Sequence, residues 1–473
     1  MIKILKYLFT AKLSKDIFIY GLGNFFISLS NFFLIPFYLN KMSVEEYGLL
    51  SLVLLLPLVF NIIYTFSLDA SIMRYYYEWR KNNLEKEAIF TIWISVLFWS
   101  IFVYIIILIF GKIFFNLILQ SVPFSPYILI ILFTSLVAIT NVFAGKILRI
   151  QENSKGFIAL SYFGSIFKIV LIILFVNYYE ASAFSIVLAG LISEILLFIP
   201  SFFVLSKSMT FRYNKLILKS SLIFQLPGLL GALLGNFSFL IDRFLIDRNF
   251  SILDVGYYSV AVKIGSIILA FMSIFQLALT PYIIKQSSEL NSRISIGKVR
   301  NAYFDVMYLL TMALVLFSSE LVDLFMGDYN YSVNIILLWI LLAYYFQSLS
   351  FIPNLQFFIS NRLSFTTFST LLFLFLFLIF GFLLKTNFGL NGIAVSFFLS
   401  NSLVFFFNYF LANKFYRLRY NSNLFSNSIL LVTISIFSVY FLESSFIVLF
   451  IKSLILVFIG YIKINKQVTL SNI

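Results

Sequence analysis

The chain has 473 residues, of which 62% are hydrophobic and only 11% charged, and its 33 Lys and Arg residues against 19 Asp and Glu give a net charge of +14. Soluble domains carry about 25% charged residues, so the composition excludes a soluble globular protein. Cysteine and histidine are absent, which excludes disulfides, thiolate nucleophiles, Cys/His metal sites and the commonest general base. We therefore expect no catalytic residue, no metal and no cofactor.

Apolar segments recur along the whole chain, and a helix of about 20 such residues spans a bilayer. The first seven segments lie near residues 17–40, 46–68, 88–111, 125–146, 157–177, 181–204 and 220–241. Seven more lie near residues 254–283, 302–325, 334–354, 365–384, 391–412, 427–442 and 446–462. They predict an all-α polytopic membrane protein with about fourteen transmembrane helices. Residues 1–15 are basic, but no small-residue cleavage site follows the first segment, so we expect no removable signal peptide.

Most Lys and Arg residues lie in the short breaks between these segments. With the N-terminus inside, 25 cations fall on the inner side and five on the outer side. Because cytoplasmic loops carry the excess of Lys and Arg, both termini are predicted to be cytoplasmic. A nucleic-acid-binding domain would gather its cations on one ordered surface, so we expect no nucleic acid partner.

A shift of 208 positions aligns the first two segments with the seventh and eighth without gaps. The shift pairs Leu22 with Leu230, Gly23 with Gly231, Ser30 with Ser238, Ser43 with Ser251, Gly48 with Gly256 and Ser51 with Ser259. Parallel repeats of this kind are typical of two-lobed transporters. We therefore predict an N-terminal six-helix lobe at 1–219, a pseudo-repeated six-helix lobe at 220–426, and two extra C-terminal helices with a cytoplasmic tail at 427–473.

Glycine and proline interrupt the first and the seventh segment at corresponding places. The interruptions are Gly21, Gly23 and Pro36 in the first segment and Pro227, Gly228, Gly231 and Gly235 in the seventh. Broken helices at matching positions indicate a transport path. Close packing between glycine-bearing helices is the structural alternative.

Two acidic residues in the first outer loop, Glu45 and Glu46, have a catalytic interpretation as the acidic pair of a membrane glycosyltransferase. The spacing from Ser43 to Glu46 is, however, that of a helix capping box. Ser251 and Asp254 repeat the same spacing in the second copy. We therefore favour helix capping for these residues.

Several short motifs in a fixed order resemble one family. They are Tyr20-Gly21, Pro36-Phe37-Tyr38, Val44-Glu45-Glu46-Tyr47-Gly48, Leu226-Pro227, Asp242-Arg243-Phe244 and Val255-Gly256-Tyr257-Tyr258-Ser259-Val260-Ala261. Over roughly residues 15–420 the chain resembles the lipid-linked oligosaccharide, or O-antigen, flippases of the multidrug/oligosaccharidyl-lipid/polysaccharide export superfamily. The resemblance implies a carrier, not an enzyme, that moves undecaprenyl-pyrophosphate-linked oligosaccharides to the outer leaflet by alternating access for surface polysaccharide biosynthesis.

The same resemblance implies a location and a set of partners. The location is the bacterial cytoplasmic membrane, which is the inner membrane where lipopolysaccharide is made. The partners are the lipid-linked oligosaccharide, the membrane lipids, and the polymerase and chain-length proteins of polysaccharide synthesis. A membrane polymerase or glycosyltransferase of the same pathway and a multidrug efflux antiporter are the alternatives. The short outer loops disfavour the enzyme, and membrane lysines disfavour a cation exporter.

A charged residue in the middle of a transmembrane helix costs about 2.5–3.5 kcal/mol, so each one is a candidate for function. Lys168 and Lys263, one in each predicted lobe, are the preferred substrate-binding cations for the pyrophosphate. An ion pair between Lys168 and Glu194 on adjacent helices is the structural alternative. Lys452 is expected to extend its ammonium group to the membrane interface, and we leave it out of the site.

Arg74, at the cytoplasmic end of the second segment, is the third substrate-binding candidate because its planar guanidinium suits bidentate phosphate contacts. Membrane anchoring beside its aromatic neighbours is the alternative. No phosphate-binding loop is present, so an ion or proton gradient is the expected energy source. Glu194 and Asp242 are the coupling candidates. Asp242 has a structural alternative, which is an ion pair with Arg243 or a helix cap.

Overall fold

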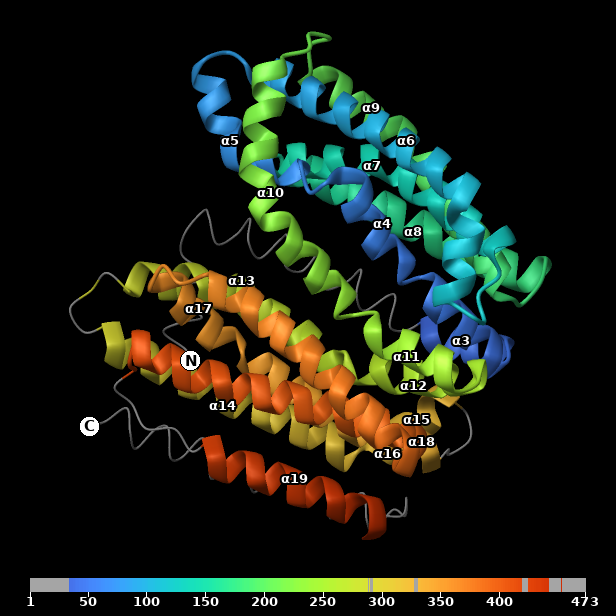
Figure 1. Ribbon diagram of the computed structural model, residues 1–473, viewed down its shortest axis with the longest axis vertical. Coiled ribbons are helices and arrows are strands. Elements are labelled where there is room, and N and C mark those ends of the chain that lie inside the picture. The colour runs from blue at the N-terminus through green and yellow to red at the C-terminus, as the bar shows by residue number, and fades with distance from the viewer. Residues whose placement is uncertain are drawn as a thin grey trace. The chain divides into compact units, whose positions relative to one another are not determined.

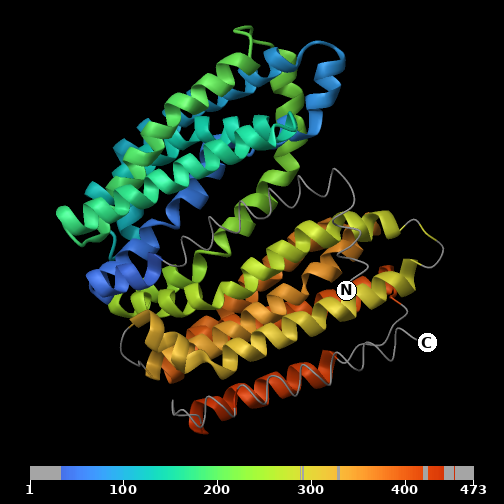
Figure 2. The ribbon, with the colours of Figure 1, turned by 180° about the vertical axis from the view of Figure 1, so that it is seen from behind.

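The computed structural model describes residues 34–287, 289, 292–326, 331–418, 424–441 and Lys452 (Figures 1 and 2). Every regular element in these residues is helical. By their contacts the described residues form two compact units. The amino-terminal unit comprises residues 41–256, and the carboxy-terminal unit comprises residues 34–40 together with those from 257 onward. An all-helical, polytopic membrane fold is therefore confirmed.

The amino-terminal unit is built around α7. Its helices are α3 Val44–Val53, α4 Leu56–Thr65, α5 Asp69–Lys81, α6 Glu85–Ile118, the π-helix η1 Phe124–Ile128, α7 Leu129–Ile150, α8 Ser154–Tyr178, α9 Ala183–Ser208, α10 Lys215–Phe237 and α11 Ile241–Asn249. Helix α7 packs most extensively on α9 and also contacts α4, α6 and α8 (Figure 1). Its central place lets its side chains Asn141 and Lys146 contact α9 and α5.

The carboxy-terminal unit is organised in the same way around α16. Its helices are α12 Ile252–Gly265, which begins in the other unit, α13 Ile267–Gln286, α14 Ser292–Leu316, α15 Ser318–Met326, α16 Tyr331–Leu349, α17 Phe351–Ile359, α18 Ser364–Phe415 and α19 Leu424–Phe441. Helix α16 packs on α18, α14 and α13. Helix α19, red in Figure 2, lies along the bundle and contacts α14 and α16.

Among the described residues, nine helices are long and apolar enough to cross a membrane, or ten when a bent pair is counted as one span. Only 11% of the most apolar stretch of α8 is buried in the protein, against 78% for the span Ser332–Ile359. The exposed apolar side chains of α8 would be unstable in water, so they face lipid. A total of fourteen spans stays a prediction, because residues 17–33 and nearly all of 446–462 lie outside the described residues.

Two helices are interrupted where the sequence has proline or glycine. Helix α10 bends by 55° between Leu226 and Gly228, at Pro227, which has no N–H to donate to the helix. The predicted break of the seventh segment is thus confirmed, whereas Gly21 and Gly23 of the first lie outside the described residues. Helix α18 contains two predicted spans, which separate at Gly389 with φ +57°, a left-handed conformation that glycine adopts at no steric cost.

The two repeated glycines meet. A Cβ atom added to Gly48 would overlap the carbonyl oxygen of Ile252, and one added to Gly256 would overlap the carbonyl oxygen of Val44. These contacts are reciprocal, because the 208-residue shift relates Val44 to Ile252 just as it relates Gly48 to Gly256. The first turns of α3 and α12 therefore cross with their backbones in contact, which only glycine permits.

The predicted capping is confirmed at both helix starts. Ser43 accepts a hydrogen bond from the Glu46 amide at 3.2 Å, and Ser251 accepts one from the Asp254 amide at 3.2 Å. Asp254 completes its box by accepting from the Ser251 amide at 3.0 Å. Glu46 instead accepts from the amide of Ala183 at 2.7 Å. It therefore caps α9, a helix far away in the sequence.

Candidate functional site

A buried ion pair joins α5 to α7 in the amino-terminal unit. The ammonium group of Lys146 contacts the carboxylate of Asp69, and their side chains are 23% and 8% exposed. Burial of two opposite charges is tolerated only when they are paired, so this contact fixes one helix on the other. Neither residue was a predicted site residue, because Lys146 counted as a cation of the following break. Asp69 directly follows the second predicted segment and Lys146 ends the fourth, so no charge inside an apolar segment pointed to the pair.

Glu194 lies on α9 and is bound by an amide. The Nδ2 atom of Asn141, on α7, donates to its carboxylate at 2.6 Å and to its backbone oxygen at 3.1 Å. The Oδ1 atom of Asn141 is buried without a hydrogen-bond partner. Two oxygen atoms, one from Glu194 and one from Asn141, thus belong to one small polar cluster. The sequence indicated the glutamate, and the asparagine was missed because an asparagine in an apolar segment is usually a packing residue.

Lys168 does not pair with Glu194. It lies on α8, which packs against α9, and its half-buried side chain makes no ion pair or hydrogen bond with any described residue. The structural alternative for Lys168, an ion pair with Glu194, is therefore not formed. What joins the two helices near this level is apolar contact and a bond from Ser193 to the oxygen of Gly164 at 3.4 Å.

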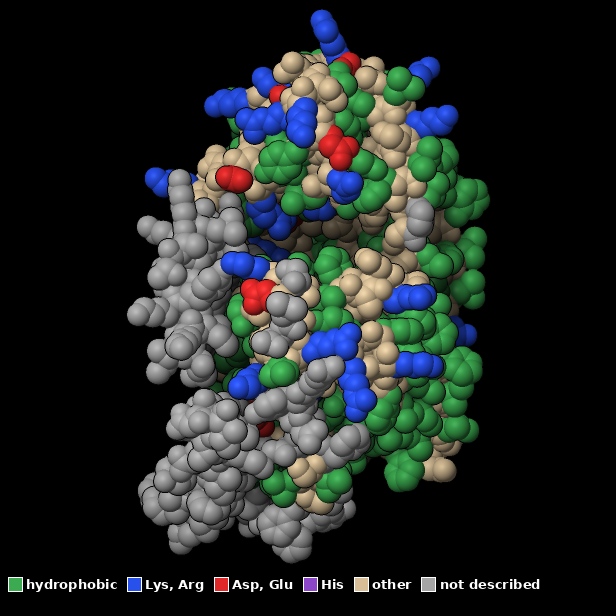
Figure 3. Space-filling view, turned by 90° about the vertical axis from the view of Figure 1, so that its left-hand side faces the viewer, with side chains coloured by type: hydrophobic (Ala, Val, Ile, Leu, Met, Phe, Trp, Pro, Cys, Tyr) green, Lys and Arg blue, Asp and Glu red, His purple; other side chains and the backbone are tan. Residues whose placement is uncertain are grey.

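Arg74 stands on the exposed face of α5. Its guanidinium donates to Glu78 at 3.1 Å, with both side chains more than half exposed, and lies 5.3 Å from the centre of the Tyr75 ring. An exposed pair of this kind contributes little stability. Figure 3 shows many blue side chains on one face of the molecule. Other exposed cations in this part of the chain are Arg80, Lys81, Lys86, Lys207, Arg212, Lys215 and Lys219.

Asp242 forms an ion pair with its neighbour Arg243 on α11. The guanidinium Nη1 lies 3.1 Å from both carboxylate oxygens, and the Asp242 side chain is only 2% exposed. A carboxylate already neutralised in this way is a poorer binding site for a second cation. Asp247, on the same helix, accepts from the amides of Gln120 and Ser121 at 2.8 and 3.3 Å and so fixes α11 to the loop after α6.

Lys263 belongs to the carboxy-terminal unit and its side chain is exposed on α12. Arg300, on α14, is by contrast 2% exposed and lies 5.8 Å from the ring of Tyr409. The sequence placed Arg300 in the break between the segments 254–283 and 302–325, and its position inside α14 corrects that assignment.

Lys452 does not extend to the membrane interface as expected. Its side chain is 1% exposed, and its ammonium group lies 2.6 Å from Glu320 and 3.3 Å from the hydroxyl of Ser319. The physical reason is that the carboxylate of Glu320, at the start of α15, neutralises the lysine inside the protein. The ammonium group therefore does not need hydration by water at the interface. Glu320 was not paired with it from the sequence.

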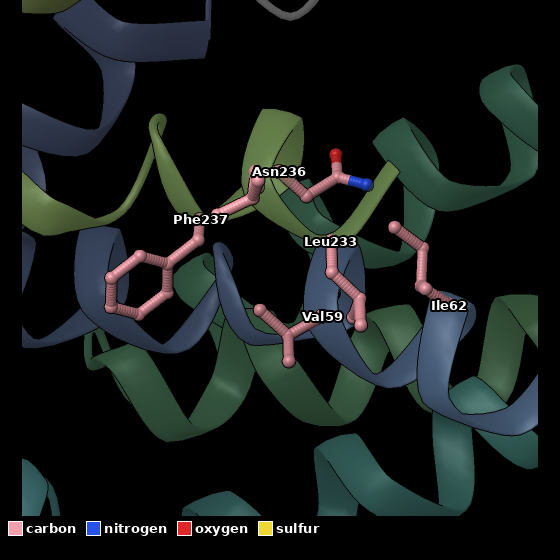
Figure 4. A pocket seen from close by; sticks show the side chains of 6 residues that line it. Val59, Ile62, Leu233, Asn236 and Phe237 are labelled. Atoms are coloured by element: carbon pink, nitrogen blue, oxygen red, sulfur yellow. The ribbon is translucent and has the colours of Figure 1, made fainter. Parts of the chain in front are cut away.

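One described cavity, of about 190 Å³, lies between α4 and α10 in the amino-terminal unit (Figure 4). It is lined by Val59, Ile62, Leu233, Leu234, Asn236 and Phe237, so a single amide is its polar lining. It suits an apolar chain and offers no charge for an anion. Among the described residues, no group of three or more acidic, cysteine or histidine side chains forms a metal site.

Comparisons with known proteins agree with this architecture. A family described as polysaccharide biosynthesis protein matches residues 13–287. A solved structure of a lipid II flippase in an inward closed conformation superposes with a TM-score of 0.73 at 13% identity, covering 94% of this chain and 99% of that one. No curated protein sequence matches the chain significantly.

Two multidrug transporters of the MATE family share the fold at lower scores. An inward-facing transporter of the MOP superfamily has a TM-score of 0.65 at 14% identity, covering 82% of this chain and 97% of its own. A mutant form of the Vibrio cholerae transporter VcmN has a TM-score of 0.58 at 14% identity, covering 85% of this chain and 96% of its own. At such identities the likeness establishes the fold alone.

Proposed function

The chain belongs to the polysaccharide biosynthesis protein family, and from this premise we propose that it is a flippase for undecaprenyl-pyrophosphate-linked oligosaccharides. The match of the family over residues 13–287 carries the proposal, and the fold shared with a lipid II flippase supports it. The carrier alternates between inward and outward access and passes the sugar unit from the inner to the outer leaflet. The chain itself makes and breaks no covalent bond.

Three cations are the proposed contacts of the pyrophosphate. Arg74 is exposed beside a basic end of the amino-terminal unit, Lys168 has no ionic partner among the described residues, and Lys263 is exposed. Fixed cations replace part of the hydration that a pyrophosphate loses in the membrane, and one charge at 4 Å is worth about 4 kcal/mol at an effective dielectric of 20. A paired lysine such as Lys146 or Lys452 already has its counter-ion.

Glu194 is the proposed site of the coupling cation. Its carboxylate and the unpartnered Oδ1 of Asn141 are oxygen ligands of the kind that hard cations prefer. Asp242, the second candidate, is held by Arg243, so we assign it a smaller part in coupling.

The proposed setting follows from the family and from the distribution of charge. We place the protein in the bacterial inner membrane with both termini in the cytoplasm, where the excess of Lys and Arg belongs. The lobes are residues 1–219 and 220–426, followed by two further helices at 427–473. The polymerase and chain-length proteins of surface polysaccharide synthesis, including that of O-antigen, are the proposed protein partners.

Reconstitution tests the function directly. In proteoliposomes holding a fluorescent undecaprenyl-pyrophosphate-linked sugar, the protein should speed transfer between leaflets, and the product should keep its mass. Removing one charged contact should slow transfer at least about tenfold in Lys168→Ala and Lys263→Ala. Lys112→Ala, which removes an exposed cation of α6, is the matched control and should transfer at the normal rate. No transfer by the folded wild-type protein would refute the proposal.

The MATE structures keep a drug antiporter as the second candidate. A cationic dye should then be exported from the same proteoliposomes, and the lipid-linked sugar should not compete with it. Elongation of the sugar in place of transfer would indicate the polymerase or glycosyltransferase alternative.

A further inference from the structure

The chain turns sharply between α4 and α5, at the end of the second predicted transmembrane segment. Phe66 and Ser67 have φ of +49° and +53°, a left-handed conformation that non-glycine residues rarely adopt in succession. The chain turns there, and α5 starts at Asp69 with a new axis (Figure 1). Helix α5 is therefore a separate arm.

The α4 side of this break is held by α6. The Nε1 atom of Trp99 donates to the oxygen of Ile63 at 2.9 Å, and the hydroxyl of Ser100 donates to the oxygen of Tyr64 at 3.1 Å. These bonds satisfy carbonyl groups near the end of α4. They fix where the arm begins and leave its direction to other contacts.

Helix α5 packs on α6, α7 and α10, and the buried ion pair that orients it is made with α7. Asp69, in the first turn of α5, pairs with Lys146, and the hydroxyl of Tyr77, two turns later, donates to the oxygen of Ile150 at 3.1 Å. The buried side chains Ile72, Tyr76 and Trp79 lie on the packed face of the arm. Two polar contacts on one side of a helix fix both its tilt and its rotation.

This rotation decides where Arg74 points. Five residues separate Asp69 from Arg74, which places their side chains about 140° apart around a helix. With Asp69 turned towards α7, Arg74 is turned away from the packed face, in agreement with its exposure. If the arm rotated, Arg74 would be redirected and its guanidinium would lose its orientation towards a ligand.

We propose that Asp69 and Lys146 are positioning residues whose ion pair holds α5 so that Arg74 captures the pyrophosphate of the lipid-linked substrate. The proposal rests on the proposed function for the identity of the ligand. Neither Asp69 nor Lys146 touches the ligand. Asp69 and Lys146 act on the ligand indirectly: their ion pair holds α5 against α7, and α5 carries Arg74.

The absence of native cysteine makes the arm easy to label. Spin labels at the exposed positions Arg80→Cys on α5 and Lys155→Cys at the start of α8, five residues after α7 ends, report the distance from the arm to the α7–α8 turn in nanodiscs. The ligand probe is undecaprenyl pyrophosphate without its sugar, and its Kd is measured in the same nanodiscs. The variants are Arg74→Ala, Lys146→Met, the exchanged pair Asp69→Lys/Lys146→Asp, and Lys452→Met as a matched control that breaks a buried ion pair in the other unit.

We expect Arg74→Ala and Lys146→Met each to raise the Kd about tenfold, and only Lys146→Met to broaden the distance distribution. The exchanged pair should restore a narrow distribution and bring the Kd back to within about threefold of the wild type. Lys452→Met should change neither the Kd nor the distance distribution. If Lys146→Met does not fold, the exchanged pair alone decides, because its recovery requires the pairing itself.

Three results would overturn the inference. They are an unchanged Kd in Arg74→Ala, an unchanged Kd in Lys146→Met with or without a broadened distance, and a folded exchanged pair that still binds weakly. An unchanged Kd in Arg74→Ala would also remove Arg74 from the proposed pyrophosphate contacts. The flippase activity itself is tested separately, by transfer of the complete lipid-linked sugar by the wild-type protein in proteoliposomes.

Discussion

The contacts α5–α7 and α8–α9 lie in the same unit and each brings a lysine helix beside an acidic one, yet they are made differently. Asp69 and Lys146 form a buried ion pair. Lys168 and Glu194 do not pair, and Glu194 is bound by Asn141 of α7 instead. A side chain reaches only what its helix face presents, so opposite charges on neighbouring helices do not by themselves predict an ion pair. Pairing identifies Lys146 as a lysine that holds two helices together, whereas binding of a ligand by Lys168 stays a prediction.

The largest effect on stability should come from breaking the ion pair between Asp69 and Lys146. Lys146→Met leaves the Asp69 carboxylate buried and unpaired, which should destabilise the protein by about 3–5 kcal/mol. Thermal unfolding in detergent measures the loss. The double variant Asp69→Asn/Lys146→Met should recover part of it, and equal loss in single and double variants would mean that the pair contributes little.

The backbone contact between α3 and α12 is an uncharged contact that can be compared with the ion pair. In Gly48→Ala the new Cβ meets the oxygen of Ile252, and overpacking of this kind costs about 1–3 kcal/mol. Gly190→Ala is the matched control, because a Cβ there has nothing within 4 Å and alanine favours the helix. Equal unfolding temperatures for the two variants would show that the α3–α12 crossing is loose.

Substitutions of Glu194 test its hydrogen bond with the amide group of Asn141. Glu194→Ala removes the carboxylate acceptor and leaves the Nδ2 atom of Asn141 only the backbone oxygen of residue 194, at a cost of about 1 kcal/mol. Glu194→Gln keeps an acceptor for Asn141, so the stability should change by less than about 0.5 kcal/mol while ion-driven transport in proteoliposomes falls. Normal ion dependence in Glu194→Gln would remove this residue from coupling.

The smallest stability effect belongs to Lys168. Without an ionic partner among the described residues, Lys168→Met should change the unfolding free energy by less than about 0.5 kcal/mol, although we expect transfer of the lipid-linked sugar to slow. A loss as large as that of Lys146→Met would reveal a hidden partner and end the distinction drawn between the two contacts.

Much of the fold followed from local signals. Apolar length predicted the transmembrane helices, Pro227 predicted the bend of α10, and the Ser-x-x-acid spacing predicted the caps at Ser43 and Ser251. Each of these depends on neighbouring residues in the sequence, for which the spacing is sufficient. The family also followed, from motifs in a fixed order, and the match over residues 13–287 confirmed it.

The partners of the charged side chains could not be predicted from local spacing. Lys452 was expected at the interface but is buried against Glu320, more than 130 residues away, and Glu46 caps the distant helix α9. Whether a charged side chain forms an ion pair depends on the rotation of its helix and on the distance to the neighbouring helix. The proposed roles of Arg74, Lys168, Lys263, Glu194 and Asp242 stay predictions.

The sequence by itself determined that this is a polytopic helical membrane protein, because burial of backbone hydrogen bonds in lipid leaves a long apolar segment no alternative to a helix. It also indicated the bend of α10 at Pro227 and the starts of α3 and α12. Only the tertiary structure decided that Gly48 and Gly256 cross, that Lys146 has a counter-ion and that Lys168 has none among the described residues. Those outcomes require helices distant in sequence to meet at a definite rotation, which no local spacing encodes.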